Sequence, residues 1–140
     1  LHVHVCSFSY RDGMPTGDPE HGAGFVFDCR SLSNPGRRPE LSVRIGTEPE
    51  IVRFLEAMPE TETFWRHVVA LVESHVDNFL ERNFSQFHVA FGCTGGQHRS
   101  VYFAERLTRF LRENYPQVTT DLVHSSKARW KLPGDAPKAE

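Results

Sequence analysis

The chain has 140 residues, of which 39% are hydrophobic and 24% charged, and its formal net charge at pH 7 is -2. This length and composition fit one globular domain, and the slightly negative charge argues against a broad nucleic-acid-binding surface. No apolar run is long enough to span a membrane, and the first residues lack the layout of a signal peptide, so we expect a cytoplasmic protein.

The first part of the chain predicts two strands separated by a loop. Residues 1–8 alternate in character, which places Val3 and Val5 on one face of a strand and His2 and His4 on the other. The loop is expected at residues 10–24, where Gly, Pro, Asp and His are frequent, and a second, mostly buried strand at residues 25–32.

Two helices are predicted in the middle of the chain, after an irregular stretch at residues 34–40. Residues 47–50 read Thr-Glu-Pro-Glu and match a capping box, with Thr47 as the N-cap. The helix that begins there is expected to end at Pro59, which cannot continue it. A longer amphipathic helix is predicted from about residue 61 to residue 82.

The last third predicts a strand at residues 87–91, a helix from about Val101 to Pro116, and a final strand at residues 118–124. We therefore expect one domain over residues 1–124, followed by a basic and then disordered tail over residues 125–140. Short strands that alternate with helices predict an α/β fold, in which ligands bind at the carboxyl ends of the strands.

The strongest functional signal is the loop Phe91-Gly92-Cys93-Thr94-Gly95-Gly96-Gln97-His98-Arg99-Ser100, which follows a predicted strand and leads into a helix. Backbone N–H groups gathered at a helix N-terminus bind anions. Arg99 adds a planar guanidinium that matches a phosphate bidentately. The loop therefore predicts a site for a phosphate or a similar oxyanion, where His98 either donates to the ligand or caps the helix.

The same loop leaves open a catalytic alternative. Cys93 and Arg99 satisfy the pattern C-x5-R, so the loop resembles the phosphate loop of cysteine-dependent phosphatases, in which the thiolate attacks phosphorus. Gly92 stands where that family usually has His, and no W-P-D-type loop supplies a general acid. The other interpretation, which we favour, is a small thiol that packs beside the pocket without reacting.

Four further residues are candidates for contacts with the ligand. Asp28 and Arg30 share one face at the end of the second predicted strand, where an aspartate can bind a sugar hydroxyl or an ammonium group. The alternative is an exposed ion pair of little energetic value. Ser7, just past the first predicted strand, is a candidate phosphate hydroxyl, and Asn34 either caps the Asn-Pro-Gly turn or reaches the ligand.

Cysteine and histidine usage argues against a metal. The chain has three cysteines and no C-x-x-C, which indicates free thiols in a reducing compartment. Its eight histidines form no H-E-x-x-H and no other tight ligand motif. We therefore expect neither a metal nor a cofactor.

Several basic residues are candidates for contacts with RNA. The basic and aromatic mix around Trp130 is typical of some nucleic-acid-binding segments, although such residues are more often only solvated. The candidates are Arg37, Arg38, Lys127, Arg129 and Lys131.

Two longer motifs, residues 27–35 and 89–102, together with the opening residues 7–15, closely resemble the C-terminal domain of the RNase adapter protein RapZ, a bacterial family. The resemblance runs in register from about residue 3 to about residue 124. It implies a single Rossmann-like domain similar to a phosphofructokinase subdomain, with a mixed sheet and flanking helices.

The resemblance also implies a function and its residues. It implies a non-catalytic domain that senses an amino-sugar phosphate, glucosamine-6-phosphate, and that binds regulatory RNA or a protein partner, with homo-oligomers left open. Asp28 would contact the sugar. The chain has no G-x4-G-K-[ST], so we expect no ATP or GTP hydrolysis. The phosphate cradle would consist of Cys93, Thr94, Gly95, Gly96, His98 and Arg99.

Overall fold

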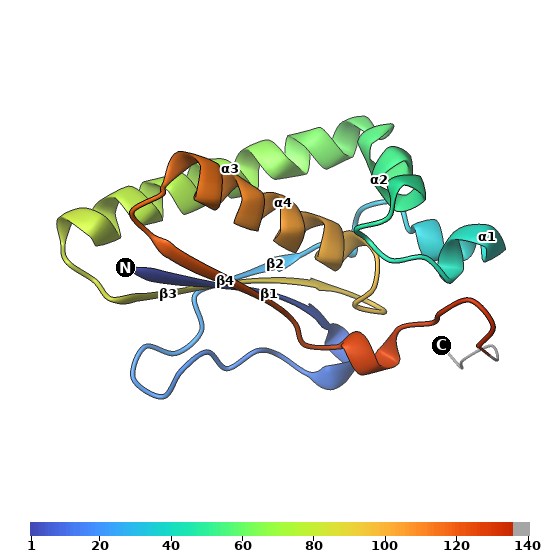
Figure 1. The fold of residues 1–140 in the computed structure, drawn as a ribbon, viewed down its shortest axis with the longest axis horizontal. Helices are drawn as coiled ribbons and strands as arrows, with labels where there is room; N and C mark the ends of the chain where they lie inside the picture. The colour runs from blue at the N-terminus through green and yellow to red at the C-terminus, as the bar shows by residue number, and fades with distance from the viewer. Residues whose placement is uncertain (136–140) are drawn as a thin grey trace.

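A four-stranded parallel sheet forms the centre of the molecule, with its helices on one face (Figure 1). The computed structural model describes residues 1–135. Within these residues the strands lie in the order β2-β3-β1-β4. Their bounds are His2–Ser9 for β1, Phe25–Asp28 for β2, Gln86–Cys93 for β3 and Thr119–His124 for β4.

Parallel pairing holds throughout the sheet, so the expected mixed sheet is wrong while the α/β class is confirmed. The reason is that each connection carries the chain back to the same end of the sheet before the next strand begins. The loop after β1 does this for β2, and helices do it for the later strands. All four carboxyl ends therefore face the same side of the domain.

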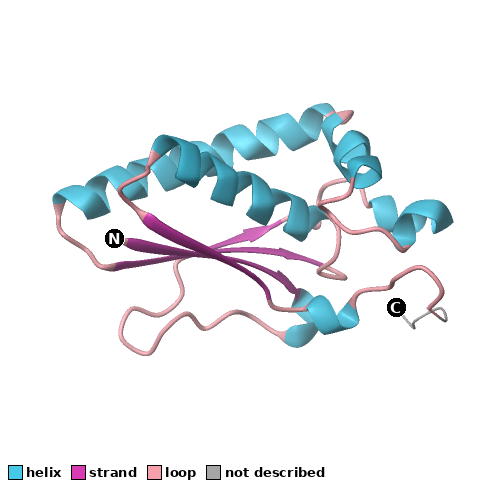
Figure 2. Cartoon of the chain, viewed as in Figure 1, coloured by secondary structure: helices cyan, strands magenta, loops and turns pink. Residues whose placement is uncertain are grey.

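The helices pack against one face of the sheet, and the loop at residues 13–24 crosses the other face (Figure 2). No helix in the described residues is both long enough and apolar enough to cross a membrane. The helices are α1 (Pro39–Ser42), α2 (Pro49–Glu56), α3 (Pro59–Glu81) and α4 (Arg99–Asn114), and the 3-10 turns are η1 (Tyr10–Asp12), η2 (Pro35–Arg37) and η3 (Lys127–Arg129).

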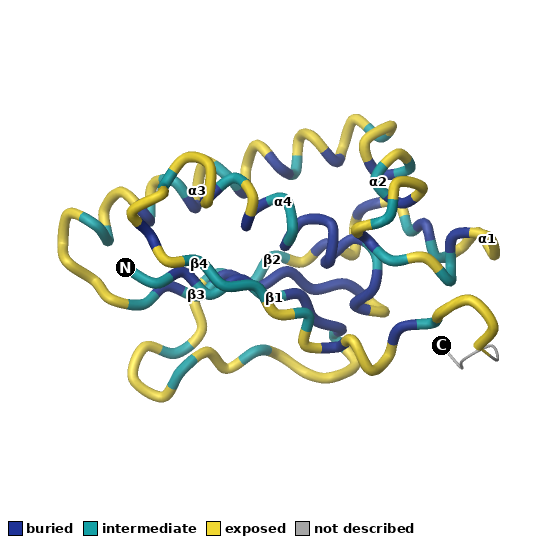
Figure 3. Tube along the Cα trace, in the orientation of Figure 1, coloured by how far each residue is buried: buried dark blue, intermediate teal, exposed yellow. Residues whose placement is uncertain are grey.

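The hydrophobic core lies between the sheet and α3 and α4 (Figure 3). As predicted, Val3 and Val5 face the helices and are almost fully buried, while His2 and His4 lie half-buried on the opposite face. Each fully buried aliphatic or aromatic side chain contributes about 1.5–3 kcal/mol. The largest buried side chains include Phe91 on β3, Val72 and Val76 on α3, and Phe103, Leu107 and Leu111 on α4.

Some predicted boundaries are wrong. β2 ends at Asp28 instead of residue 32, because the chain turns there and the N–H of Leu32 donates to the carbonyl of Cys29 at 3.2 Å. Glu48, not Thr47, is the N-cap of α2, and its side chain makes no capping hydrogen bond. Pro59 starts α3, where its missing N–H costs nothing.

The segment after β4 packs on the domain, contrary to the tail predicted from residue 125. Ser126 Oγ accepts a 2.7 Å hydrogen bond from the N–H of Ser9, and Trp130 is only 8% exposed. The Trp130 Nε1–H donates to the carbonyl of Gly96 at 2.8 Å. A buried indole thus attaches this segment to the β3–α4 loop. The disorder predicted at the very end falls on residues 136–140, outside the described residues.

Candidate anion-binding site

The β3–α4 loop, residues 94–98, lies at the carboxyl end of the sheet and leads into the N-terminus of α4. No side chain in the described part of the chain caps α4, and the first turn of this helix contains no acidic residue. The space that a Cβ on Gly95 would enter is empty within 4 Å, and no described residue accepts a hydrogen bond from the Gly95 N–H. The positive end of the helix dipole and this N–H are therefore available to an anion.

Gly96 shows why this loop needs glycine. Its φ is +66°, in the left-handed region, and a Cβ there would lie 2.8 Å from the backbone nitrogen of Ser9. A side chain would be strained by the backbone conformation and would also collide with β1. The loop is therefore held close to the end of β1.

Arg99 points inward and is 4% exposed. Its Nη1 donates to the carbonyls of Arg30 at 3.0 Å and Leu32 at 2.8 Å. Its Nε is buried and has no partner among the described residues. A buried donor left unpaired costs about 1–3 kcal/mol, so an acceptor brought next to this guanidinium edge would be stabilised.

Arg99 contributes to a polar cavity of about 440 Å³, which we call the arginine pocket. Three arginines, Arg30, Arg37 and Arg99, line it together, and no acidic residue is among its lining residues in the described chain. The other lining residues are Ser31, Leu32, Ser33, Asn34, Phe54 and Thr94.

A second polar cavity, of about 340 Å³, is lined by Thr94, Gly95, Gln97 and His98 of the loop and is called the loop pocket. Asn34 and Thr94 line both pockets, so the two are neighbours. The described lining of the loop pocket also lacks a carboxylate. Its other residues are Arg11, Gly36, Ser42, Ala128, Arg129 and Lys131.

Gln97 holds the loop in place, and the sequence did not single it out. It is 4% exposed, and its Nε2 donates to the carbonyls of Arg44 and Lys131, each at 2.8 Å. A longer contact, 3.2 Å, reaches the carbonyl of Ser42. These partners come from segments distant in sequence, so no local pattern could have indicated them.

His98 is the N-cap residue of α4, as one of its two predicted roles had it, but its side chain makes no capping hydrogen bond with the described residues, and it also lines the loop pocket. Burial lowers the pKa of His98 to about 4, although the nearby carbonyls of Leu41, Ser42 and Arg44 oppose the shift. None of these carbonyls forms a hydrogen bond of normal geometry with Nε2, which is buried without a partner. The ring is therefore neutral at pH 7 and can donate to a ligand without carrying charge.

Cys93 is 2% exposed and lines neither pocket. Its Sγ lies 3.1 Å from Ser100 Oγ. The absence of a histidine at Gly92 also has a physical reason, because a Cβ there would lie 2.4 Å from the ring of Phe8 and 2.6 Å from that of Tyr10. This geometry favours the packed thiol over the phosphatase alternative.

Asp28 and Arg30 form the ion pair that the sequence offered as an alternative. Arg30 Nε donates to Asp28 Oδ1 at 2.9 Å and Nη2 to Oδ2 at 2.8 Å, with about half of each side chain exposed. These hydrogen bonds lower the pKa of Asp28. Arg30 also lies over the ring of Tyr10 at 3.8 Å. The pair fixes the direction of one guanidinium of the arginine pocket, and a contact of Asp28 with a sugar stays a prediction.

Ser7 was expected just past the first strand, but it lies within β1 and is 1% exposed. Its Oγ is paired with His124 Nδ1 at 2.6 Å, and it lines neither pocket. Asn34 caps the turn, since its Oδ1 accepts from the N–H of Gly36 at 2.9 Å.

The residues predicted to contact RNA have different surroundings. Arg37 lines the arginine pocket, while Arg129 and Lys131 line the loop pocket. Arg38 lies over the ring of Phe54 at 5.1 Å, and Lys127 over that of Trp130 at 5.8 Å. Contacts with RNA stay a prediction.

A third cavity, of about 330 Å³, lies at the amino ends of β2 and β3, away from the loop. Its walls include the rings of Phe25, Phe79, Phe84 and Phe87. An apolar aromatic lining does not suit a phosphate, so the anion site is assigned to the other end of the strands.

Comparison with known proteins gives a consistent family. The family model described as the RapZ C-terminal domain matches residues 1–126. The packed structure continues beyond this match as far as Trp130.

Curated relatives share this region. The chain is 38% identical to a nucleotide-binding protein of Psychrobacter sp. over 130 residues, covering 92% of the chain and 40% of the relative. It is 40% identical over 119 residues to a nucleotide-binding protein of Halorhodospira halophila, and this match covers 85% of the chain and 40% of the relative. It is 41% identical over 101 residues to a nucleotide-binding protein of Nitrosomonas europaea, and this match covers 72% of the chain and 33% of the relative. The chain thus spans no more than 40% of the length of these relatives.

Proposed function

Because this chain belongs to the RapZ C-terminal domain family, we propose that it is a non-catalytic domain that binds an amino-sugar phosphate such as glucosamine-6-phosphate at the β3–α4 loop. The phosphate would lie between the Gly95 N–H, the N-terminus of α4 and the guanidinium of Arg99. The sugar would extend along the shared wall formed by Asn34 and Thr94.

The observation that carries this proposal is the group of three arginines around one cavity beside an uncapped helix N-terminus. Asp28 already balances the charge of Arg30, so a phosphate dianion would balance the charges of the other two arginines. Each charge-assisted hydrogen bond contributes about 1.5–3 kcal/mol. The cavity volume of about 440 Å³ falls in the range of small-molecule sites. The buried, unpaired Nε of Arg99 supports the same position.

The ammonium group of the sugar favours an anionic acceptor, and neither pocket has a carboxylate among its described lining residues. Asp28 is the acid next to the arginine pocket through its pair with Arg30. A carboxylate has lone pairs beyond those that Arg30 occupies, so it can also accept from an ammonium group. On this proposal the hexose would lie between Asp28 and the phosphate.

The relatives are named as nucleotide-binding proteins, but most of their length lies outside the match. The chain lacks the G-x4-G-K-[ST] loop that binds nucleotide phosphates in many such proteins. A nucleoside monophosphate is therefore the informative comparison ligand. Its phosphate carries the same charge as that of the sugar phosphate, but the rest of the molecule is larger.

Isothermal titration calorimetry tests the proposal with two neighbouring arginines. Arg37 lines the arginine pocket, whereas Arg38 lies over Phe54 outside it. We expect saturable binding of glucosamine-6-phosphate to the wild type, weakened about tenfold by Arg37→Ala because one charged contact is lost. Arg38→Ala removes the same charge from the protein and should leave the affinity unchanged.

The Arg38→Ala control distinguishes the loss of a direct contact with the ligand from the loss of one positive charge anywhere on the protein. Equal weakening in Arg37→Ala and Arg38→Ala would mean that only net charge matters. No binding of any hexose phosphate by the wild type would contradict the proposal. Tighter binding of a nucleoside monophosphate than of the sugar phosphate would replace the ligand class.

A further inference from the structure

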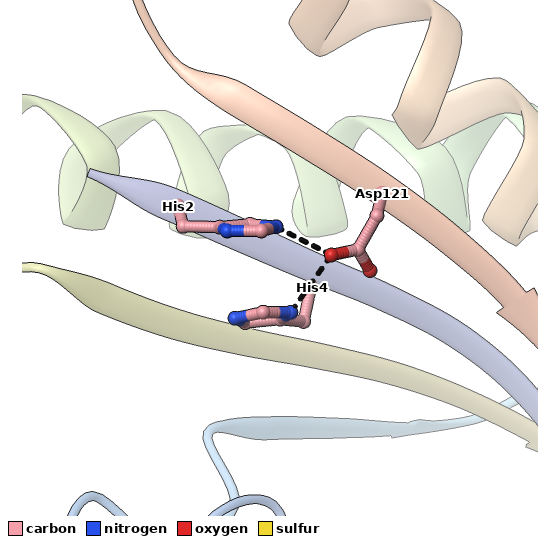
Figure 4. Close-up of side chains that lie close together, drawn as sticks. All are labelled: His2, His4 and Asp121. Carbon is pink, nitrogen blue, oxygen red and sulfur yellow. Dashed lines mark hydrogen bonds and ion pairs between the residues drawn. The ribbon is translucent and has the colours of Figure 1, made fainter.

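A second cluster of polar side chains lies on the sheet face opposite the helices, remote from the anion site. His2 and His4 project from β1 and Asp121 projects from β4 on the same face (Figure 4). His4 and Asp121 are direct partners across the two parallel strands. No local metal motif could indicate this cluster, because 117 residues separate His4 from Asp121.

The three side chains meet at one carboxylate oxygen. His2 Nε2 contacts Asp121 Oδ2, and His4 Nδ1 lies 2.9 Å from the same oxygen. One ligand atom from each residue lies within 4.8 Å of the others. The two imidazole rings are stacked, with their centroids 3.9 Å apart.

The other nitrogen of His4 determines what this arrangement can hold. His4 Nε2 lies 2.6 Å from Gln86 Oε1, a carbonyl oxygen that only accepts, so Nε2 must carry the proton. In the neutral ring Nδ1 then bears a lone pair that faces the Asp121 carboxylate. Two acceptors at 2.9 Å are stabilised by a cation between them, which can be a proton or a metal ion.

From this geometry we propose that His2, His4 and Asp121 form a binding site for a divalent transition-metal ion such as Zn²⁺. Two imidazoles and one carboxylate are a ligand set that suits this class of ion. A metal-bound histidine typically donates its second N–H to a carbonyl, as His4 does to Gln86. Water would complete the coordination.

A metal ion can reach the three ligand side chains from solvent, and these side chains can shift to coordinate it. The ligand side chains are between 28% and 44% exposed, and a cavity of about 310 Å³ under the 13–24 loop is lined by His4 and Asp121. Metal–ligand distances of about 2.0–2.2 Å place ligand atoms somewhat farther apart than the present contacts. The partly exposed side chain of Asp121 can move away from the two histidines. The rings of His2 and His4 must tilt out of their stacked arrangement so that their lone pairs point at the ion.

His88 takes no part as a ligand. Its ring stacks on His4 with centroids 4.5 Å apart, and its Nε2 lies 2.7 Å from Asp18 Oδ2. It supports the orientation of His4 from the other side. Binding of the ion would join β1 to the edge strand β4 and so stabilise the sheet.

The experiment uses tag-free, chelator-treated protein titrated with Co²⁺ and then Zn²⁺. We expect one equivalent of Co²⁺ to give a d–d absorption band that one equivalent of Zn²⁺ removes. Asp121→Asn and His4→Gln should each weaken binding at least tenfold, and Gln86→Leu about tenfold, as for other partners of ligating histidines. His67→Gln, an exposed histidine on α3, is the matched control and should change nothing.

Circular dichroism establishes that each variant is folded, which is expected because the cluster lies outside the core. Absence of a one-equivalent cobalt complex in the wild type would overturn the proposal. So would an affinity that is unchanged in both Asp121→Asn and His4→Gln. Loss of binding in His67→Gln would assign the ion to a different histidine and would equally overturn it.

Discussion

Gln97 and Lys131 form a reciprocal pair: Gln97 Nε2 donates to the Lys131 carbonyl at 2.8 Å, and the Lys131 N–H donates to Gln97 Oε1 at 2.8 Å. This pair joins the β3–α4 loop to the segment after β4. Together with the bond from Trp130 to Gly96, it fixes the loop that would hold the phosphate. The C-terminal segment therefore holds the loop of the proposed anion site in its position.

The first prediction concerns this pair. Gln97→Leu keeps most of the volume but removes the hydrogen bonds of the buried Gln97 side chain with Arg44 and Lys131. We expect the free energy of unfolding in urea to fall by about 3 kcal/mol, since three hydrogen bonds are lost and each contributes about 0.5–1.5 kcal/mol. Gln117→Leu, at an exposed position, is the control. A loss below about 0.5 kcal/mol for Gln97→Leu would show that the pair is unimportant.

The second prediction concerns the buried, neutral His98. Its pKa in the folded protein is about 4, below the ordinary value of about 6.5 that applies in the unfolded chain. The unfolded state therefore takes up a proton first as pH falls, and the stability that the neutral ring provides is lost between pH 6.5 and pH 4. Integrated over this window, the loss is about 3 kcal/mol at most.

Urea unfolding of the wild type and of His98→Asn at about pH 7 and about pH 4.5 measures this contribution. The wild type should lose more stability than the variant on acidification. His67→Gln, which removes an exposed histidine, should follow the wild type. Parallel pH dependence in the wild type and His98→Asn would show that burial does not keep the ring neutral.

The third prediction separates the two roles open to Asp28. If its carboxylate contacts the ammonium group, Asp28→Asn should reduce affinity for glucosamine-6-phosphate about tenfold and leave that for glucose-6-phosphate almost unchanged. Calorimetry with both sugars measures the ratio. Equal weakening for the two ligands would mean that Asp28 only orients Arg30, to which it is bound.

The fourth prediction concerns the thiols. Cys29 and Cys93 are 0% and 2% exposed, whereas Cys6 is partly exposed, although burial raises the pKa of Cys6. Iodoacetamide should therefore modify Cys6 first, as read by mass spectrometry of peptides, with denatured protein as the control for equal reactivity. Rapid and selective modification of Cys93 would favour the phosphatase alternative.

Local patterns predicted a large part of this fold. The alternation of His2, Val3, His4 and Val5 gave the first strand and its faces, and the glycines with Arg99 located the loop at the strand end. The parallel order β2-β3-β1-β4 could not be predicted, because strand order depends on long-range packing. Asp121 and its histidines meet only through that order.

The same limit explains what was missed at the anion site. The contacts of Gln97 and Trp130 join segments 34 residues apart, and they depend on where the chain turns after β4. The basic residues near Trp130 predicted a solvated tail. The segment after β4 instead packs on the domain, because the Trp130 indole is buried there. Arg99 was correctly placed near the loop, but its bonds to the carbonyls of Arg30 and Leu32 were not foreseen.

The measurement that tests the phosphate site most directly is ¹H–¹⁵N NMR during titration with glucosamine-6-phosphate. The site predicts that the largest shifts are at the backbone amide of Gly95 and the side-chain Nε–H of Arg99, which have no protein acceptor in the described structure. Shifts confined to the aromatic cavity around Phe25 and Phe87, or no shifts at saturating ligand, would contradict it.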